Sequence, residues 1–109
     1  MLFQTVTCQK QINSFLDFYE DHERTRAAEL FVLSIKKSFR LIETGPTKWR
    51  EYPSTYKSLK VFGFRWIFEH RYWFGYQEAD VRIVTNVLFD TSDIPNLIAG
   101  IDQIIDMEW

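Results

Sequence analysis

The sequence has few of the residues from which disulfides, metal clusters and phosphate-binding loops are built. Cys8 is the only cysteine among 109 residues, so an internal disulfide and a cysteine metal cluster are both excluded. We interpret Cys8 as a small buried hydrophobe rather than a nucleophile. The chain has four glycines and no glycine-rich stretch, which argues against a backbone loop that cradles phosphate. We therefore expect no cofactor and no metal.

Long hydrophobic runs are also missing. The longest is Leu30–Leu33, far short of the roughly 20 apolar residues that a membrane span requires. The N-terminus lacks the basic region ahead of an apolar one that marks secretory signals. We expect a soluble, cytoplasmic protein that has no membrane partner.

An excess of positive charge is absent as well. Lysine and arginine number 13 against 15 aspartate and glutamate residues, which gives a net charge of −2. Binding along a nucleic-acid backbone relies on lysine and arginine to release counterions from the phosphates. We therefore expect no direct DNA binding, and any surface that binds anions must be local.

Apolar and aromatic residues are plentiful, at 46% and 17% of the chain. This content and the length predict one domain, residues 1–109, with a substantial core. A short strand is expected over residues 1–7. Apolar residues at spacings of three and four predict helices over residues 10–20 and 26–43, with Thr25 as a candidate cap and Gly45-Pro46 as the stop.

The second half has the alternation of strands. Residues 62–69, 72–76 and 81–88 alternate with period two, and the apolar run near Val87 favours a central position for the last strand. An ordered loop is expected over residues 47–56, and a final helix over residues 94–107.

This order predicts an α+β fold, in which two N-terminal helices pack on a mostly antiparallel twisted sheet (β-α-α-β-β-β) and a C-terminal helix follows. The predicted core consists of Phe15, Phe31, Ile35, Phe39, Val61, Ile83 and Val87. Leu30 and Leu33 widen the apolar surface of the second helix beyond one stripe. That helix is either buried on two sides, which we favour, or offers a face to another chain.

Two sets of residues could carry chemistry. Glu69-His70-Arg71 could supply a base, an acid and a phosphate clamp for phosphodiester cleavage, but consecutive strand residues point to opposite faces, so a charged hairpin turn is the favoured interpretation. The second set could form a positive patch on neighbouring strands, where a partner or an anion would bind. It comprises Lys57, Lys60, Arg65, Arg71 and Arg82. The weak catalytic candidates are His70, Arg71 and Arg82.

The element order and the segment Val81–Phe89, which runs into Asp93-Ile94-Pro95, resemble the RelE/ParE superfamily of toxins from bacterial type II toxin–antitoxin systems. Members of ParE type often end the last strand with a Val-Leu-His type sequence, followed by an Asp-Ile-Pro-like helix start. The hairpin from Arg65 through Tyr72–Tyr76 also looks like that of the family. This resemblance implies a toxin that is neutralised by a cognate antitoxin protein.

The sequence departs from the family where RNA cleavage would be performed. Ribosome-dependent members use basic residues on the sheet and an arginine, histidine or tyrosine just beyond the last strand, whereas residues 89–93 here are Phe-Asp-Thr-Ser-Asp. The favoured function is therefore a ParE-like toxin, which the resemblance would make an inhibitor of DNA gyrase. The alternatives are a RelE-like endonuclease that acts on messenger RNA at the ribosome, and a non-toxic interaction protein that keeps only the fold.

Overall fold

The computed structural model describes residues 2–45, 49–53, 56–57, 63–78, 81–90, 94 and 104–106. Its elements are β1 (Phe3–Thr5), α1 (Val6–Asp21), α2 (Thr25–Thr44), β2 (Arg65–Glu69), β3 (Tyr72–Glu78), β4 (Arg82–Phe89) and β5 (Ile104–Asp106). The predicted α+β class and the order β-α-α-β-β-β are confirmed.

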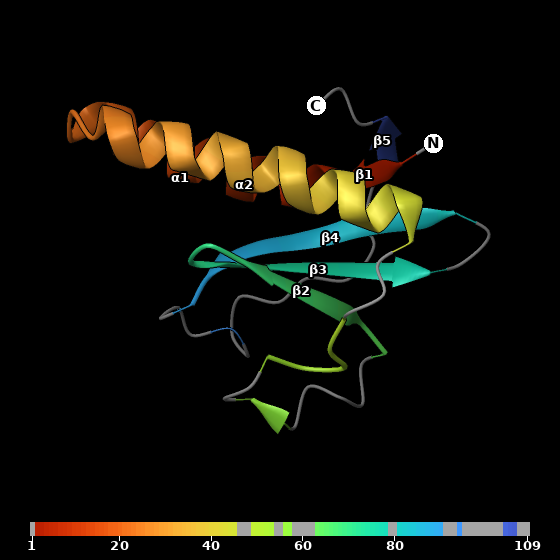
Figure 1. The fold of residues 1–109 in the computed structure, drawn as a ribbon. Coiled ribbons are helices and arrows are strands. Elements are labelled where there is room, and N and C mark those ends of the chain that lie inside the picture. The colour runs from red at the N-terminus through yellow and green to blue at the C-terminus, as the bar shows by residue number, and fades with distance from the viewer. Residues whose placement is uncertain are drawn as a thin grey trace.

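The strands form one sheet in the order β2-β3-β4-β1-β5 (Figure 1). Neighbouring strands are antiparallel, except that β1 runs parallel to β4. The pairing of β4 with both β3 and β1 confirms its predicted central position. The parallel crossover from β1 to β4 contains both helices and the β2–β3 hairpin.

Helices α1 and α2 lie side by side over one face of the sheet (Figure 1). Helix α1 starts directly after β1, where the side chain of Thr5 accepts a hydrogen bond of 3.1 Å from the backbone N–H of Cys8. Both predicted apolar stripes face the core, with Ile12 and Tyr19 of α1 and Phe31, Ile35, Phe39 and Ile42 of α2 buried. Thr25 is not a cap, because α2 begins at Thr25 and Arg24 occupies the cap position without a side-chain hydrogen bond.

The main core lies between these helices and the sheet. Helical side chains such as Phe31 and Ile35 meet strand side chains such as Phe74 and Val87 there. Five residues of the predicted core are buried: Phe31, Ile35, Phe39, Ile83 and Val87. Phe15 is partly buried against this core, and Val61 lies outside the described residues.

A second cluster covers the opposite face of the sheet. Phe64, Trp66, Trp73, Leu88 and Ile94 form it, and Tyr52 and Tyr56 pack against it from the preceding loop. The two backbone hydrogen bonds between Arg50 and Trp66, of 2.8 and 2.7 Å, attach this loop to the outer edge of β2. The predicted aromatic face of β2 is therefore covered at Phe64 and Trp66, while Phe68 is 42% exposed.

The predicted C-terminal helix is wrong at its end. Ile104–Asp106 form β5, which pairs antiparallel with β1, instead of the last turn of a helix over residues 94–107. Apart from Ile94, the rest of that range lies outside the described residues. Neighbouring isoleucines suit either a strand or one face of a helix, and pairing with the distant β1 decides between them.

The prediction that α2 is buried on two sides is also wrong, because Leu33 is 59% exposed. The helix buries Phe31, Ile35, Phe39 and Ile42 against the core and leaves Leu33 and Leu41 toward solvent. The exposed leucines fit the alternative prediction, in which α2 offers an apolar face to another chain.

A side chain of α1 completes the edge of β4 beyond the short strand β1. The Oε1 atom of Gln11 accepts a hydrogen bond of 2.8 Å from the backbone N–H of Val87, and its Nε2 atom donates one of 3.3 Å to Oδ1 of Asn86. A buried backbone N–H without an acceptor would be costly. Gln11 thus stands in for the strand that would otherwise pair there.

Gly75 leaves the space that Trp66 fills. The two residues are paired across β3 and β2, and a Cβ atom at Gly75 would lie 2.9 Å from one ring atom of Trp66 and 3.0 Å from a second. Real Cβ contacts are longer, and the completely buried indole has no free direction in which to move. The second cluster therefore requires glycine at this position.

We predict that Gly75→Ala lowers the free energy of unfolding by about 1–3 kcal/mol, because it overpacks this contact. The loss should be smaller when the same change is made in a Trp66→Leu background, which lacks the six-membered ring. Urea unfolding of the four proteins measures this coupling. Additive losses would contradict the proposed steric conflict.

Candidate functional site

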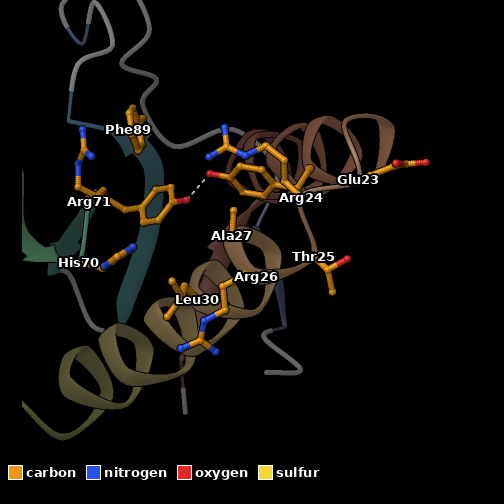
Figure 2. A pocket seen from close by; sticks show the side chains of 11 residues that line it. Glu23, Arg24, Thr25, Arg26, Ala27, Leu30, His70, Arg71 and Phe89 are labelled. Atoms are coloured by element: carbon orange, nitrogen blue, oxygen red, sulfur yellow. Dashed lines mark hydrogen bonds between the residues drawn. The ribbon is translucent and has the colours of Figure 1, made fainter.

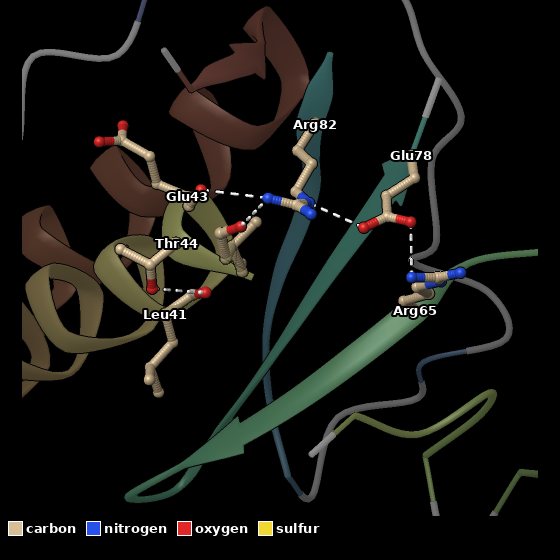
Figure 3. A network of polar contacts seen from close by, with 7 residues as sticks. Leu41, Glu43, Thr44, Arg65, Glu78 and Arg82 are labelled. Carbon is tan, nitrogen blue, oxygen red and sulfur yellow. Dashed lines mark hydrogen bonds and ion pairs between the residues drawn. The ribbon is translucent and has the colours of Figure 1, made fainter. Parts of the chain in front are cut away.

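The predicted basic residues do not form one patch. Arg65 and Arg82 converge on Glu78, with nitrogen–oxygen distances of 2.5 and 2.7 Å, at the end of the sheet where β2 begins (Figure 3). Arg71 lies in the turn at the other end of the β2–β3 hairpin. Lys57 is exposed in the loop before β2, and Lys60 lies outside the described residues. The prediction of a single patch is therefore wrong for Arg71.

Arg82 has a structural role. Its Nη1 atom donates to the backbone carbonyls of Ile42 and Glu43, at 3.2 and 3.1 Å, in the last turn of α2 (Figure 3). A cation at a helix C-terminus satisfies unpaired carbonyls and opposes the negative end of the helix dipole. Arg82 thereby ties α2 to β4, and Glu78 extends the tie to β3. These contacts remove Arg82 from the catalytic candidates.

We predict that Arg82→Gln lowers the free energy of unfolding by about 1–2 kcal/mol, since it breaks charged hydrogen bonds at a partly exposed site. Arg26→Gln is the matched control, because Arg26 and Glu29 are largely exposed and 3.4 Å apart. The control should change stability by less than about 0.5 kcal/mol. Equal effects in chemical unfolding would refute the structural role of Arg82.

The hydrogen bond from Arg82 lowers the pKa of Glu78 below its ordinary value of 4.5, and the charge of Arg65 acts in the same direction. A carboxylate with a lowered pKa in the folded state stabilises that state at pH values above the ordinary pKa. This contribution is lost as the pH falls through the lowered pKa. Protonation of Glu78 at low pH should therefore destabilise the contacts among Arg65, Glu78 and Arg82.

We expect Glu78→Gln to remove this part of the acid sensitivity. Between about pH 6 and about pH 3, the urea midpoint should fall less in the variant than in the native chain, which loses the Glu78 charge over that range. A parallel fall in the two proteins would mean that other carboxylates carry the pH dependence.

At the opposite end of the sheet, His70 and Arg71 form the two-residue turn between β2 and β3. His70 has a positive φ of 59°, as the first central residue of a tight hairpin turn requires. Arg71 makes two hydrogen bonds with the carboxylate of Asp90, at 3.1 and 3.3 Å. The interpretation of Glu69-His70-Arg71 as a charged turn is thus confirmed, with Glu69 directed to Lys37 at 3.1 Å.

This turn forms one wall of a hollow of about 540 Å³ (Figure 2). The connection between α1 and α2 and the first turn of α2 form the facing wall. Its lining residues are Tyr19, Glu23, Arg24, Thr25, Arg26, Ala27, Leu30, His70, Arg71, Tyr72 and Phe89. The hydroxyls of Tyr19 and Tyr72 are hydrogen-bonded to each other within it.

The electrostatics of this hollow favour anions. Three arginines line it against one carboxylate, that of Glu23, although Asp90 pairs with Arg71 and Glu29 pairs with Arg26 from outside the lining. Burial and the hydrogen bond with Tyr19 raise the pKa of Tyr72, so its phenol remains a neutral hydrogen-bond donor in neutral solution. Among the described residues, no group of three or more His, Cys, Asp or Glu side chains could hold a metal ion.

A second hollow, of about 800 Å³, follows the outer edge of β2. Leu41, Trp49 and Phe68 contribute exposed apolar surface there, and Arg50, Trp66, Ile67 and Glu69 complete the lining. Arg65 stacks on the face of Trp49, with 4.3 Å between the guanidinium carbon and the ring centroid.

Sequence reasoning identified His70 and Arg71 but missed the residues that face them. Neither Tyr19 nor Arg24 is among the candidate residues that the sequence suggested. The adjacent run Glu23-Arg24-Thr25-Arg26 holds two arginines at a helix start, which was the available signal. His22 is exposed beside Phe18 and takes no part in the hollow.

Comparisons of the chain with protein-family models, curated proteins and solved structures give no match. No helix in the described part of the chain is long and apolar enough to cross a membrane.

Proposed function

We propose that this chain is the toxin of a type II toxin–antitoxin pair, of ParE type, which acts by binding a target rather than by cleaving RNA. The observation that carries this proposal is that three of the basic residues predicted from the sequence are separated into two ion-paired groups. Arg65 and Arg82 share Glu78 at one end of the sheet, while Arg71 pairs with Asp90 at the other. Phosphodiester cleavage requires several such groups to converge on one phosphate.

The region just beyond β4 also favours binding over cleavage. Phe89 is half-buried at the end of the strand, and the following Asp90 is occupied by Arg71. No arginine, histidine or tyrosine occurs within residues 89–93. The β-α-α-β-β-β order on which the family resemblance rests is present in the structure, which supports a family member without this cleavage set.

The exposed apolar surface offers a place for a protein partner. Leu33 on α2, together with Leu41 and Phe68 at the second hollow, leaves large side chains in solvent. Such surface is typical of interaction sites, and it lies beside the edge strand β2, whose outer edge pairs with Arg50 at Trp66. The partners in this proposal are a cognate antitoxin and a cytoplasmic target, DNA gyrase by resemblance, and no cofactor, membrane or direct DNA contact is required.

One observation favours the RelE-like alternative. His70, Arg71 and Tyr72 face Arg24 across the first hollow, which brings an imidazole, two guanidinium groups and a phenol to one site. These groups could bind RNA and transfer protons at the ribosome. Arg82, which the sequence suggested for this role, is not among them.

We predict that expression of the chain alone slows bacterial growth without cutting messenger RNA. His70→Ala should retain this effect, because a binding toxin needs no imidazole, whereas Phe68→Lys should reduce it by placing a charge in the apolar surface. Growth curves with variants at matched soluble levels, together with primer extension on translated transcripts, provide the measurement. Purified gyrase supercoiling assays then test the target.

Two outcomes would reject this function. Codon-specific cuts that disappear in His70→Ala would establish the endonuclease, since that histidine would then be required. Normal growth at high levels of folded protein would instead favour a non-toxic interaction protein that keeps only the fold.

A further inference from the structure

The first hollow contains a buried hydrogen-bond donor that lacks an acceptor. Tyr19 and Tyr72 are 7% and 3% exposed, and their hydroxyls are bonded to each other. Each hydroxyl carries one proton, so a bond between the two uses one proton and leaves the second. Among the residues that the structure describes, no other group accepts a hydrogen bond from this pair. The remaining O–H therefore has no acceptor among these residues, and both tyrosines line the hollow.

A cation without a counterion lies beside this donor. Arg24 and Arg71 are both close enough to Tyr72 for their charges to oppose the rise of its pKa. Arg71 is neutralised by Asp90, whereas Arg24, within the described part of the chain, contacts the ring of Tyr19 at 6.0 Å and forms no ion pair. Figure 2 shows the Arg24 guanidinium at the hollow, near the hydrogen bond between the phenols.

The first turn of α2 also lines the hollow. Thr25, Arg26 and Ala27 line the hollow, and the preceding cap residue, Arg24, makes no side-chain hydrogen bond to them. The first N–H groups of a helix have no partner within the helix, and the dipole is positive at this end. These groups supplement the Arg24 and tyrosine donors, which carry the argument.

We propose that this hollow binds the phosphate group of a small phosphate ester of nucleotide size. The Arg24 guanidinium and the phenol pair offer charged and neutral donors in one hollow, and the first turn of α2, where the helix dipole is positive, lines it as well. The volume of about 540 Å³ falls within the range of roughly 300–1,000 Å³ for small-molecule sites, so it exceeds what a lone ion needs. Ala27, Leu30 and Phe89 offer apolar surface to the remainder of the ligand. This site does not depend on the toxin function.

The test is a calorimetric or NMR titration of the full chain with three probes: inorganic phosphate, a nucleoside 5′-monophosphate and the matching nucleoside. The nucleotide should bind and the nucleoside should not. Stronger binding of the nucleotide than of inorganic phosphate supports the proposed ester, whereas equal binding of the two would overturn the ester and leave a site for free phosphate. Binding of the nucleoside as strong as that of the nucleotide, or no binding of either phosphate at about 10 mM, overturns the proposal.

Arg24→Gln should weaken nucleotide binding about tenfold or more, as expected for the loss of one charge-assisted hydrogen bond. Arg40→Gln is the matched control, because Arg40 is an exposed arginine of α2 that does not line the hollow. Equal weakening in both variants would indicate general charge attraction and would overturn the site.

The tyrosine pair gives a distinctive pattern. Tyr19→Phe and Tyr72→Phe each leave one hydroxyl whose O–H is free to donate, so each single variant should bind more tightly than the double variant, which has none. Thermal unfolding establishes that each protein is folded, and if the double variant is not, the comparison of Arg24→Gln with Arg40→Gln decides. Undiminished binding by a folded double variant would show that the phenols do not contact the ligand.

Discussion

The need to bury both faces of β4 governs this structure. Val84 and Val87 belong to the core beneath the helices, while Leu88 belongs to the cluster on the other face. A strand that is apolar on both sides requires cover on both sides. Helices α1 and α2 supply one cover, and the aromatic cluster with Tyr52 and Tyr56 supplies the other. The positions of the hairpin, the loop and the N-terminal strand follow from that demand.

Because β4 is central, the charged residues are confined to the ends of the sheet. At one end Arg82, Glu78 and Arg65 connect α2, β4, β3 and β2, so these charges serve packing. At the other end the β2–β3 turn meets the α1–α2 connection and forms the hollow with Arg24 and the tyrosine pair. Arginines that pair with a carboxylate of the chain therefore serve packing, whereas Arg24, which forms no ion pair within the described part of the chain, is available to a ligand.

The periodic elements were predictable because their patterns are local. The stripe through Phe31, Ile35 and Phe39 identified α2, and the apolar run near Val87 identified the central strand. The turn at His70 and Arg71 was predictable from a break in the alternation. Only the wall of the hollow formed by this turn was predictable. Tyr19 and Arg24, on the facing wall, are about 50 residues away in sequence and carry no pattern that links them to the turn.

The sequence by itself determined the class of the fold, the two helical stripes and the hairpin, because hydrophobic period and turn chemistry depend on near neighbours. Tertiary structure alone decided that Ile104–Asp106 pair with β1, that Arg82 binds the end of α2, and that two tyrosine hydroxyls meet in one hollow. Each of these contacts joins residues that are distant in the chain. The physical reason is that strand pairing and side-chain convergence are set by how the covered faces of β4 pack, which no local pattern encodes.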